Sequence, residues 1–465
     1  MACEHEPFED ALALERKPVV VVGLARSGLA AALFLARRGE EVVATDRKGR
    51  AELQEEALTL EAAGVRLELG GHDVGTFARA KRIVVSPGVP LEAPELAAAR
   101  AAGVPVLGEL ELAYENLKGT VAAVTGTKGK STTTAALGAM LKAAGRDTRV
   151  GGNIGEALIS LVEGSTAETV FAVEVSSFQL ETVASFRPKV AVFLNLSADH
   201  LDRHRSYEAY AQAKGRIFES QTAEDFAVVN AADADALRLA RAGRARLVPF
   251  HPDGVPDGDG AFFDEGEARL RRGGTLETLF LRREVQLPGA HLATDVLAAA
   301  TAARLLGASP EAIAEAVRAF RGVEHVLEHV ATVGGIAFFN DTKATNVEAA
   351  RQSLQAFSQP VLLILGGRYK GGDFALLAPA LRAHGKRVFA IGEAQDRILQ
   401  SLGAHLPVEP ASSLREAVAR AAAAGAPGDV VLLAPGCSSF DMFKDYADRG
   451  RQFKEAVRRL AAGER

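Results

Sequence analysis

Short, fully apolar runs alternate with longer stretches rich in Ala, Leu, Arg and Glu along the whole chain. Val19–Val22, Val121–Thr125 and Val430–Leu433 are runs of this kind, and none shows the apolar–polar alternation of a strand with one solvated face. Strands that are covered on both faces carry such patterns, and intervening helices allow them to pair in parallel. The sequence therefore predicts repeated strand–helix units and an α/β fold.

The apolar runs fall into three blocks, which a chain of 465 residues can accommodate as domains of ordinary size. We expect a first domain over residues 1–112, a central domain over 113–322 and a third domain over 323–465. Within the second block, Phe250–Gly274 is rich in Gly, Asp and Pro, which predicts turns and hairpin loops.

A glycine-rich turn follows the first strand of the central block. Gly126-Thr-Lys-Gly129-Lys130-Ser131-Thr132 leads from an apolar run into a predicted helix. Glycines let backbone N–H groups surround a phosphate, the helix N-terminus adds positive charge, and Lys and Ser reach phosphates and Mg²⁺. The loop is shorter than a standard Walker loop, and an ordinary strand–helix turn is the competing interpretation. The order of strand, glycines, lysine and hydroxyls favours a phosphate site.

Three further polar residues of this block are candidates for chemistry. Glu174 lies within a strongly apolar strand, so its carboxylate needs a partner, which is either Mg²⁺ or an Arg or Lys. His200 follows the next apolar run, at the end of a strand where ligands bind in open sheets, although a lone histidine there is more often structural. Lys214 lies in the predicted helix Tyr207–Phe218, and its position alone predicts a solvated surface lysine.

The first block opens like a nucleotide-binding βαβ unit. Gly23 and Gly28 fill the outer positions of the dinucleotide fingerprint, but Ala25 occupies its middle position, which argues against NAD. A nucleotide phosphate at the helix N-terminus remains compatible, and Asp46 is placed to contact a ribose or base. The alternative is a plain strand–helix packing unit.

Charge and cysteine content limit the function classes. The net charge of −5 and the scattered basic residues argue against general affinity for nucleic acid or anionic membranes. No apolar run approaches the roughly 20 residues that span a bilayer, and Met1–Arg16 is acidic and lacks the apolar core of a signal peptide. Cys3 and Cys437 do not predict a disulfide or a metal site. We therefore expect a cytoplasmic protein in a reducing compartment.

Taken in order, the motifs resemble those of the Mur ligase family, from about Pro18 to Leu460. The motifs are Thr125–Thr132, Gly151–Gly155, Glu174–Thr182, Asp199-His200, Tyr210–Lys214, Asn340–Asn346, Leu365–Gly367 and Pro435–Ser439. The segment Asn340-Asp-Thr-Lys-Ala-Thr-Asn346 is similar to that of the family branch that adds D-glutamate. The Asp-Tyr-Ala-His motif of other branches is absent.

The resemblance implies three α/β domains: an N-terminal Rossmann-like domain that binds a UDP-substrate, a central domain with a parallel sheet like that of P-loop ATPases, and a C-terminal Rossmann-like domain that binds the amino acid. It implies ATP-dependent addition of D-glutamate to UDP-N-acetylmuramoyl-L-alanine through an acyl phosphate, in peptidoglycan precursor synthesis. The implied cofactors are ATP and Mg²⁺. We expect a monomer whose partners are these small molecules, without nucleic acid or membrane.

The resemblance also assigns roles to individual residues. Catalytic roles fall on Lys130, His200 and Lys214, and Lys214 matches a lysine that the family carbamylates. The implied Mg²⁺ ligands are Ser131, Glu174, His200 and Lys214. The implied ATP-binding residues are Gly126, Thr127, Lys128, Gly129, Lys130, Ser131, Thr132, Asp341 and Lys343. The implied substrate-binding residues are Gly23, Ser27, Asp46, Arg47, Asn153, Ser176, Gln179, Lys343, Thr345, Lys370 and Ser439.

Three positions near the implied nucleotide differ from the family pattern. Lys128 stands where the family usually has Asn, and it adds charge near the phosphates. Leu292 and Asp295 replace two asparagines of a His-Asn-x-x-Asn segment, which places the adenine-side contacts in question.

Val326 is a fourth difference, because the family usually has an Arg there beside the phosphates. That role is either lost or taken over by a neighbour such as Arg318 or Arg321. Two alternative functions therefore stay open. One is a ligase similar to folylpolyglutamate synthase, a family that places a similar loop near its N-terminus. The other is a nucleotide-binding paralogue with a degenerate site.

Overall fold

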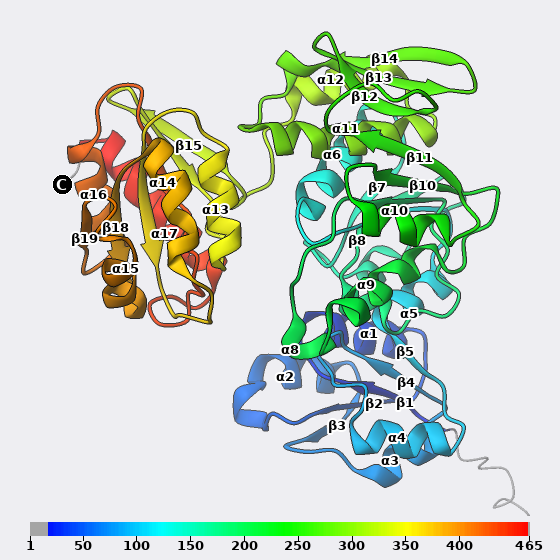
Figure 1. The fold of residues 1–465 in the computed structure, drawn as a ribbon. Coiled ribbons are helices and arrows are strands. Elements are labelled where there is room, and N and C mark those ends of the chain that lie inside the picture. The colour runs from blue at the N-terminus through cyan, green and yellow to red at the C-terminus, as the bar shows by residue number, and fades with distance from the viewer. Residues whose placement is uncertain (1–16, 464–465) are drawn as a thin grey trace, which may run out of the picture.

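A computed structural model describes residues 17–463 and shows three α/β domains that follow one another along the chain (Figure 1). Each domain is built around its own sheet, and most neighbouring strands pair in parallel. The predicted fold class is therefore confirmed. The acidic segment Met1–Arg16, which includes Cys3, lies outside the described residues. No helix of the described range is long and apolar enough to cross a membrane.

The N-terminal sheet has the strand order β3-β2-β1-β4-β5, and all of its pairs are parallel. This order is typical of Rossmann-type sheets, in which ligands bind beyond the strand ends where the order reverses. The strands are β1 (Val19–Val22), β2 (Val42–Asp46), β3 (Arg66–Leu69), β4 (Arg82–Val85) and β5 (Val106–Gly108). The helices are α1 (Arg26–Arg37), α2 (Gln54–Ala62), α3 (Val74–Arg79), α4 (Pro94–Ala101) and α5 (Glu109–Asn116).

The central sheet has the order β14-β13-β12-β11-β10-β9-β6-β8-β7. Its first strand, β6, lies between β8 and β9, so the loop after β6 opens at the middle of the parallel part. The strands are β6 (Thr120–Thr125), β7 (Thr148–Gly152), β8 (Val170–Glu174), β9 (Val190–Phe193), β10 (Phe226–Asn230), β11 (Arg246–His251), β12 (Gly260–Asp264), β13 (Glu267–Arg272) and β14 (Thr275–Leu281). The helices are α6 (Lys130–Ala143), α7 (Ser177–Leu180), α8 (Leu201–His204), α9 (Tyr207–Gly215), α10 (Ala234–Arg241), α11 (Ala290–Leu305) and α12 (Pro310–Ala319).

The region Phe250–Gly274, predicted to hold turns and hairpin loops, contains the β12–β13 hairpin. With β14, this hairpin adds an antiparallel edge to the parallel sheet.

The C-terminal sheet has the order β15-β16-β20-β17-β18-β19, with β15 antiparallel to β16. The strands are β15 (Glu328–Val333), β16 (Ile336–Asn340), β17 (Val361–Gly366), β18 (Gly385–Ile391), β19 (Val408–Pro410) and β20 (Val430–Leu433). The helices are α13 (Val347–Gln355), α14 (Ala378–His384), α15 (Gln395–Leu402), α16 (Leu414–Ala424) and α17 (Tyr446–Ala461).

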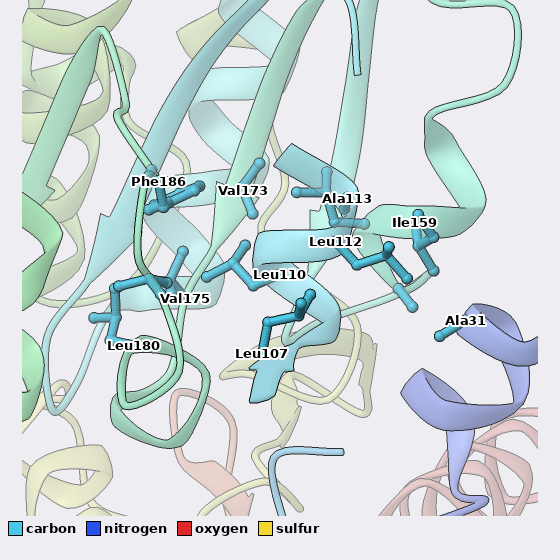
Figure 2. Close-up of a cluster of buried hydrophobic side chains, with 14 of the residues drawn as sticks. Ala31, Leu107, Leu110, Leu112, Ala113, Ile159, Val173, Val175, Leu180 and Phe186 are labelled. Atoms are coloured by element: carbon cyan, nitrogen blue, oxygen red, sulfur yellow. The ribbon is translucent and has the colours of Figure 1, made fainter. Parts of the chain in front are cut away.

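Helix α5 joins the N-terminal and central domains through a shared apolar core. Leu110 and Leu112 belong to the same buried cluster as Ile159, Val173 and Phe186 of the central domain (Figure 2). A core that spans both domains opposes their separation, because opening it would expose apolar surface to water. The two domains therefore form one packed unit.

Two buried carboxylates on α5 strengthen this connection. Glu109 accepts a hydrogen bond from the Ile159 N–H at 2.7 Å, and burial raises the pKa of Glu109 to about 7. Glu111 accepts from three successive backbone N–H groups, those of Ala184, Ser185 and Phe186, at 2.9, 2.7 and 3.2 Å. The carboxylate thus satisfies amides of a loop that would otherwise lack partners.

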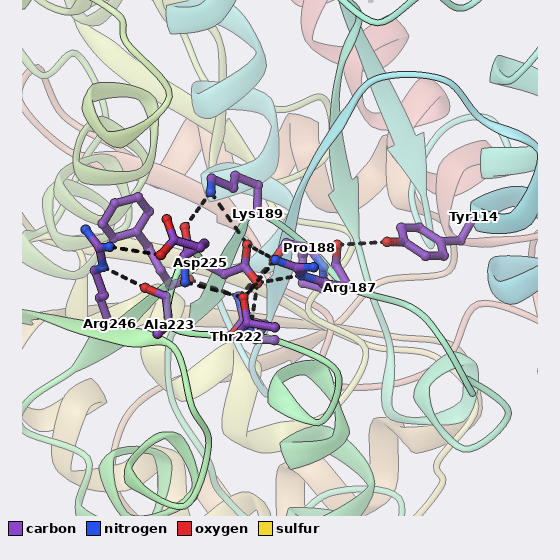
Figure 3. Close-up of polar contacts among 11 residues, drawn as sticks. Tyr114, Arg187, Pro188, Lys189, Thr222, Ala223, Asp225 and Arg246 are labelled. Carbon is purple, nitrogen blue, oxygen red and sulfur yellow. Dashed lines mark hydrogen bonds and ion pairs between the residues drawn. The ribbon is translucent and has the colours of Figure 1, made fainter.

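The same helix contacts a polar network just before β9 and β10 (Figure 3). The Tyr114 hydroxyl donates to the Arg187 carbonyl at 3.3 Å, and the Arg187 guanidinium pairs with Asp225 at 2.7 Å. Asp225 also accepts from the Thr222 N–H at 2.8 Å, which fixes the turn before β10. These bonds connect the segments that precede β9 and β10 to each other and to α5.

Replacing Glu111 with Ala should lower the free energy of unfolding by about 3 kcal/mol, because three backbone N–H groups lose their acceptor. Urea unfolding followed by far-UV circular dichroism measures this change. Glu115→Ala on the exposed face of α5 is the matched control and should cost less than about 1 kcal/mol, since it removes only a surface ion pair with Arg82. Equal losses in both variants would contradict this account of α5.

Candidate active site

The phosphate loop connects the end of β6 to the start of α6. Gly129 is the N-cap of α6 and has φ 82°, while Gly126 has φ 151°. A Cβ on Gly126 would lie 3.0 Å from the Leu194 Cβ. Both positions therefore favour glycine for conformational or steric reasons. The sequence placed Lys130 at the opening of the helix, and this is confirmed.

Asn195, which follows β9, holds this loop in place. Its side chain accepts from the Lys128 N–H at 2.8 Å and donates to the Lys128 carbonyl at 3.1 Å. The Thr127 hydroxyl lies 3.0 Å from that of Tyr210. Sequence reasoning did not assign Asn195 a role, although its place directly after an apolar run was a usable signal.

A chain of hydrogen bonds starts at Ser131, the second residue of α6. Its hydroxyl donates to Glu174 Oε2 at 2.7 Å, and Glu174 Oε1 accepts from the Asn153 amide at 2.6 Å. From the C-terminal domain, Lys343 Nζ donates to Ser131 Oγ at 2.6 Å. Glu174 is 1% exposed, so the buried carboxylate predicted from the sequence has hydroxyl and amide donors.

A cavity of about 800 Å³ lies at this junction of the central and C-terminal domains. Most of the residues expected to bind ATP, Mg²⁺ and D-glutamate line this cavity. Those that line it are Thr127, Lys128, Gly129, Lys130, Ser131, Thr132, Asn153, Glu174, His200, Asp341, Lys343, Thr345 and Lys370.

The charged groups of this cavity are partly desolvated. Burial lowers the pKa of both Lys128 and Lys130, and nearby carboxylates partly oppose this. Burial raises the pKa of Asp341 to about 6, while its hydrogen bonds from the Ser353 hydroxyl and the Leu327 N–H act in the opposite direction. Such a cluster of partly buried lysines is suited to an anionic ligand, whose charge would favour their protonated forms.

Lys214 lies behind the phosphate loop, at 2% exposure. Its Nζ donates to the Gly126 carbonyl at 2.8 Å, and burial holds the pKa of Lys214 well below its usual value, with Lys130 adding to the effect. The helix pattern alone predicted a solvated lysine, and that prediction is wrong. The side chain points under the loop because α9 packs its Tyr210–Lys214 face against β6 and the loop.

Other residues of the expected site do not line this cavity. Ser176 caps α7, and its backbone N–H donates to the Gln179 side chain at 3.0 Å, so this pair has a local structural role. Ser439 is 2% exposed, and its carbonyl accepts from two later backbone N–H groups. Gly126 contributes a carbonyl to Lys214 behind the loop.

A second cavity, of about 840 Å³, lies in the N-terminal domain at the strand ends. It is lined by the expected residues Gly23, Ser27, Asp46 and Arg47. The Asp46 carboxylate accepts from the backbone N–H groups of Leu24 and Lys48 at 2.7 and 2.9 Å, so it shapes the loop after β1. His72 also lines this cavity, and sequence reasoning did not single it out.

Arg449 of α17 organises the loops of the C-terminal domain. It is fully buried and donates to the Thr342 hydroxyl at 2.9 Å and to the Cys437 carbonyl at 3.2 Å. These bonds join the segment that carries Lys343 to the segment that carries Ser439. Nothing in the sequence pattern distinguished this arginine from the other charged residues of α17.

The neighbours expected to substitute for an arginine at Val326 do not reach the cavity. Arg318 pairs with Glu284 at 3.0 Å, and Arg321 donates to the Arg318 carbonyl. Neither lines the cavity, whereas Lys128 does.

The donor set beside the loop is suited to a hard cation. Within residues 17–463, no three His, Cys, Asp or Glu side chains form a group that could hold a metal by themselves. Ser131 Oγ and Glu174 Oε2 lie 2.7 Å apart and are both oxygen atoms that could ligate a metal. His200 lines the same cavity with a half-exposed ring. Mg²⁺ commonly takes few protein oxygens and completes its shell with phosphate and water, so these residues fit it.

Comparison with known proteins agrees with this architecture. The N-terminal domain model described as Mur ligase MurD-like matches residues 17–108, the Mur ligase middle domain matches 124–303, and the Mur ligase glutamate ligase domain matches 327–437. The MurF ligase of Thermotoga maritima, solved in complex with ADP, shares the fold with a TM-score of 0.59 at 17% identity, over 96% of this chain and 99% of that one.

Curated relatives are similar over almost their full length. The UDP-N-acetylmuramoylalanine–D-glutamate ligase of Acidobacterium capsulatum is 48% identical over 96% of both chains. The ligase of the same name from Geotalea daltonii is 44% identical over 97% of this chain and 99% of its own. With three family domains in order and relatives this similar, the chain belongs to the Mur ligase family.

Proposed function

We propose that the chain joins D-glutamate to UDP-N-acetylmuramoyl-L-alanine with consumption of ATP, a step of peptidoglycan precursor synthesis. The observation that carries this function is the contact of Lys343 with Ser131, because it closes one cavity around the phosphate loop, Glu174 and the C-terminal lysines. Full-length relatives with up to 48% identity are ligases of this name.

The two alternative functions have less support. The family domain at residues 17–108 belongs to the MurD-like type, which disfavours a folate ligase that lacks such a domain. A degenerate site would be expected to lose contacts, but Ser131, Glu174 and Lys343 form a continuous hydrogen-bonded chain.

An amine cannot displace the oxygen of a free carboxylate, because oxide is a poor leaving group. The carboxylate must therefore be activated first. A carboxylate oxygen of the muramoyl peptide attacks the γ-phosphorus of ATP, the bond to the ADP oxygen breaks, and an acyl phosphate forms. The neutral amine of D-glutamate then attacks the acyl carbon, loses a proton, and phosphate leaves. Lys130 and Lys343 offset the charge of the two anions that meet, and Mg²⁺ held by Ser131 and Glu174 would neutralise phosphate charge further. The C-terminal domain limits access of water to the acyl phosphate.

We assign the substrates to two separate cavities. We assign the UDP end to the N-terminal cavity at Gly23, Ser27, Asp46 and Arg47, and the D-glutamate carboxylates to cations such as Lys370 in the interdomain cavity. We also propose that the enzyme acts as a monomer in the cytoplasm, which suits its small-molecule substrates.

A phosphate-release assay with a panel of amino acids tests this function. Phosphate and ADP should appear when both UDP-N-acetylmuramoyl-L-alanine and D-glutamate are present, and L-glutamate should be a poor substrate. Lys130→Ala should reduce turnover at least about 100-fold, because the phosphates lose a partly buried cation. Equal turnover with the two glutamate enantiomers, or full activity of Lys130→Ala, would refute the assignment.

Gly129→Ala should weaken ATP binding strongly. A Cβ at this position would lie 2.3 Å from Asp295 Oδ1, so the loop must shift in addition to bearing the strain of φ 82°. Gly145→Ala is the matched control, because Gly145 has φ 73° but no neighbour within 4 Å of its built Cβ. Both variants should lose about 1–2 kcal/mol of stability from the left-handed backbone. Nucleotide titration by calorimetry should show an affinity loss in Gly129→Ala alone.

Lys214 is proposed to carry a carbamate. Its depressed pKa favours the neutral amine, which attacks carbon dioxide at its carbon and releases one proton. Lys214→Ala should lower kcat about 100-fold, and acetate or formate should restore part of it by replacing the lost carboxylate. The control Lys189→Ala removes a half-exposed lysine near Asp225 and should leave kcat unchanged. Steady-state kinetics decide the question, and full activity of Lys214→Ala would contradict the carbamate.

A further inference from the structure

A third cavity, of about 910 Å³, plays no part in the mechanism above. It lies where the loop after β4 of the N-terminal domain meets α8, α9 and the end of α10 in the central domain (Figure 1). Among residues 17–463, its lining shares no residue with the two cavities assigned to the substrates. Helix α9 separates it from the phosphate loop, because Ala213 lines this cavity whereas Tyr210 and Lys214 contact the loop. A ligand bound here would therefore be distinct from ATP and from the UDP-substrate.

Four arginines line this cavity, and two of them are already paired within the protein. Arg203 pairs with the Glu181 carboxylate at 3.1 Å and donates to the Val89 carbonyl at 2.9 Å, which joins α8 to the N-terminal domain. Arg216 Nε pairs with the Glu219 carboxylate at 2.8 Å. The negative charges of Glu181 and Glu219, which also line the cavity, are therefore offset by these two arginines.

The other two arginines are free to bind a ligand. The side chains of Arg205 and Arg244 are exposed and have no hydrogen bond or ion pair within residues 17–463. Glu92 is the acid of the lining that lacks a partner in the same part of the chain. The lining thus carries two unpaired positive charges and one unpaired negative charge. Guanidinium groups form paired hydrogen bonds with phosphate and carboxylate oxygens, so this lining favours an anionic ligand.

Apolar side chains complete the lining. Leu91 from the N-terminal domain and Leu239 from α10 are half-buried, and Phe218 is 2% exposed. Cavities that combine apolar walls with a few charged groups are the usual form of small-molecule sites. We therefore expect a ligand that has both an anionic group and an apolar one.

We propose that this cavity binds a phosphate monoester that carries an apolar organic group. The phosphate pairs with Arg205 and Arg244, and the organic group packs against Phe218 and Leu239. A phosphate monoester has about two negative charges at pH 8, whereas a carboxylate has one, so the monoester matches the two free guanidinium groups. The site lies beyond the proposed ligase reaction and does not depend on it.

Calorimetric titration with phenyl phosphate at pH 8 tests the site, with saturating AMP-PNP, Mg²⁺ and UDP present to occupy the two substrate cavities. The wild-type chain should bind phenyl phosphate at least about fivefold more tightly than inorganic phosphate, which lacks the apolar group, or benzoate, which has one charge. Arg205→Gln and Arg244→Gln should each weaken this binding at least about fivefold, because a charge-assisted pair is lost. Glu92→Gln should strengthen it about threefold, since an unpaired negative charge leaves the lining.

Arg241→Gln is the matched control, because Arg241 is an exposed arginine at the end of α10 that does not line the cavity. It removes the same charge and should change the affinity for phenyl phosphate less than about twofold. Far-UV circular dichroism checks that every variant is folded. Three results would each overturn the proposal: no saturable binding by the wild-type chain below about 10 mM, equal affinity for phenyl phosphate and inorganic phosphate, or equal affinity of Arg205→Gln, Arg244→Gln and Arg241→Gln for phenyl phosphate.

Discussion

The Ser131 hydroxyl bridges Glu174 of the central domain and Lys343 of the C-terminal domain by hydrogen bonds. It donates to Glu174 at 2.7 Å and accepts from Lys343 at 2.6 Å, so one oxygen atom fixes both groups relative to the phosphate loop. A hydroxyl is suited to this place because it is both donor and acceptor. The interdomain cavity depends on this contact, since the lysines of the C-terminal domain enter the site only when that domain lies against the loop.

The rest of the architecture supplies a rigid support for this junction. The N-terminal and central domains share a buried cluster around α5, and Glu111 ties α5 to a loop through three backbone N–H groups. The C-terminal domain has clusters largely of its own, with few apolar contacts from the central domain such as Leu292. An interface built from polar contacts at a ligand cavity costs less to open than a shared core, so domain closure is expected to occur there.

The two lysines beside the phosphate loop lie in different surroundings. Lys130 lines the cavity, whereas Lys214 lies beneath the loop and donates to the Gly126 carbonyl. Desolvation lowers the pKa of both, because a buried ammonium loses hydration that few neighbouring acids replace. For Lys130 a bound anion would favour the charged form, whereas the carbamate proposed for Lys214 requires the neutral amine, which burial favours.

The sequence by itself determined the three sheets, the phosphate loop and its lysine, because apolar runs and glycines report strand burial and backbone shape locally. It also placed Glu174 in a buried strand. The tertiary structure alone decided that Lys214 is buried, that Ser176 and Gln179 satisfy each other, and that Arg449 joins two loops. The surroundings of Asp295 were likewise decided only by the tertiary structure. Its burial against Gly129, a contact between residues far apart in sequence that no local pattern encodes, raises its pKa to about 8.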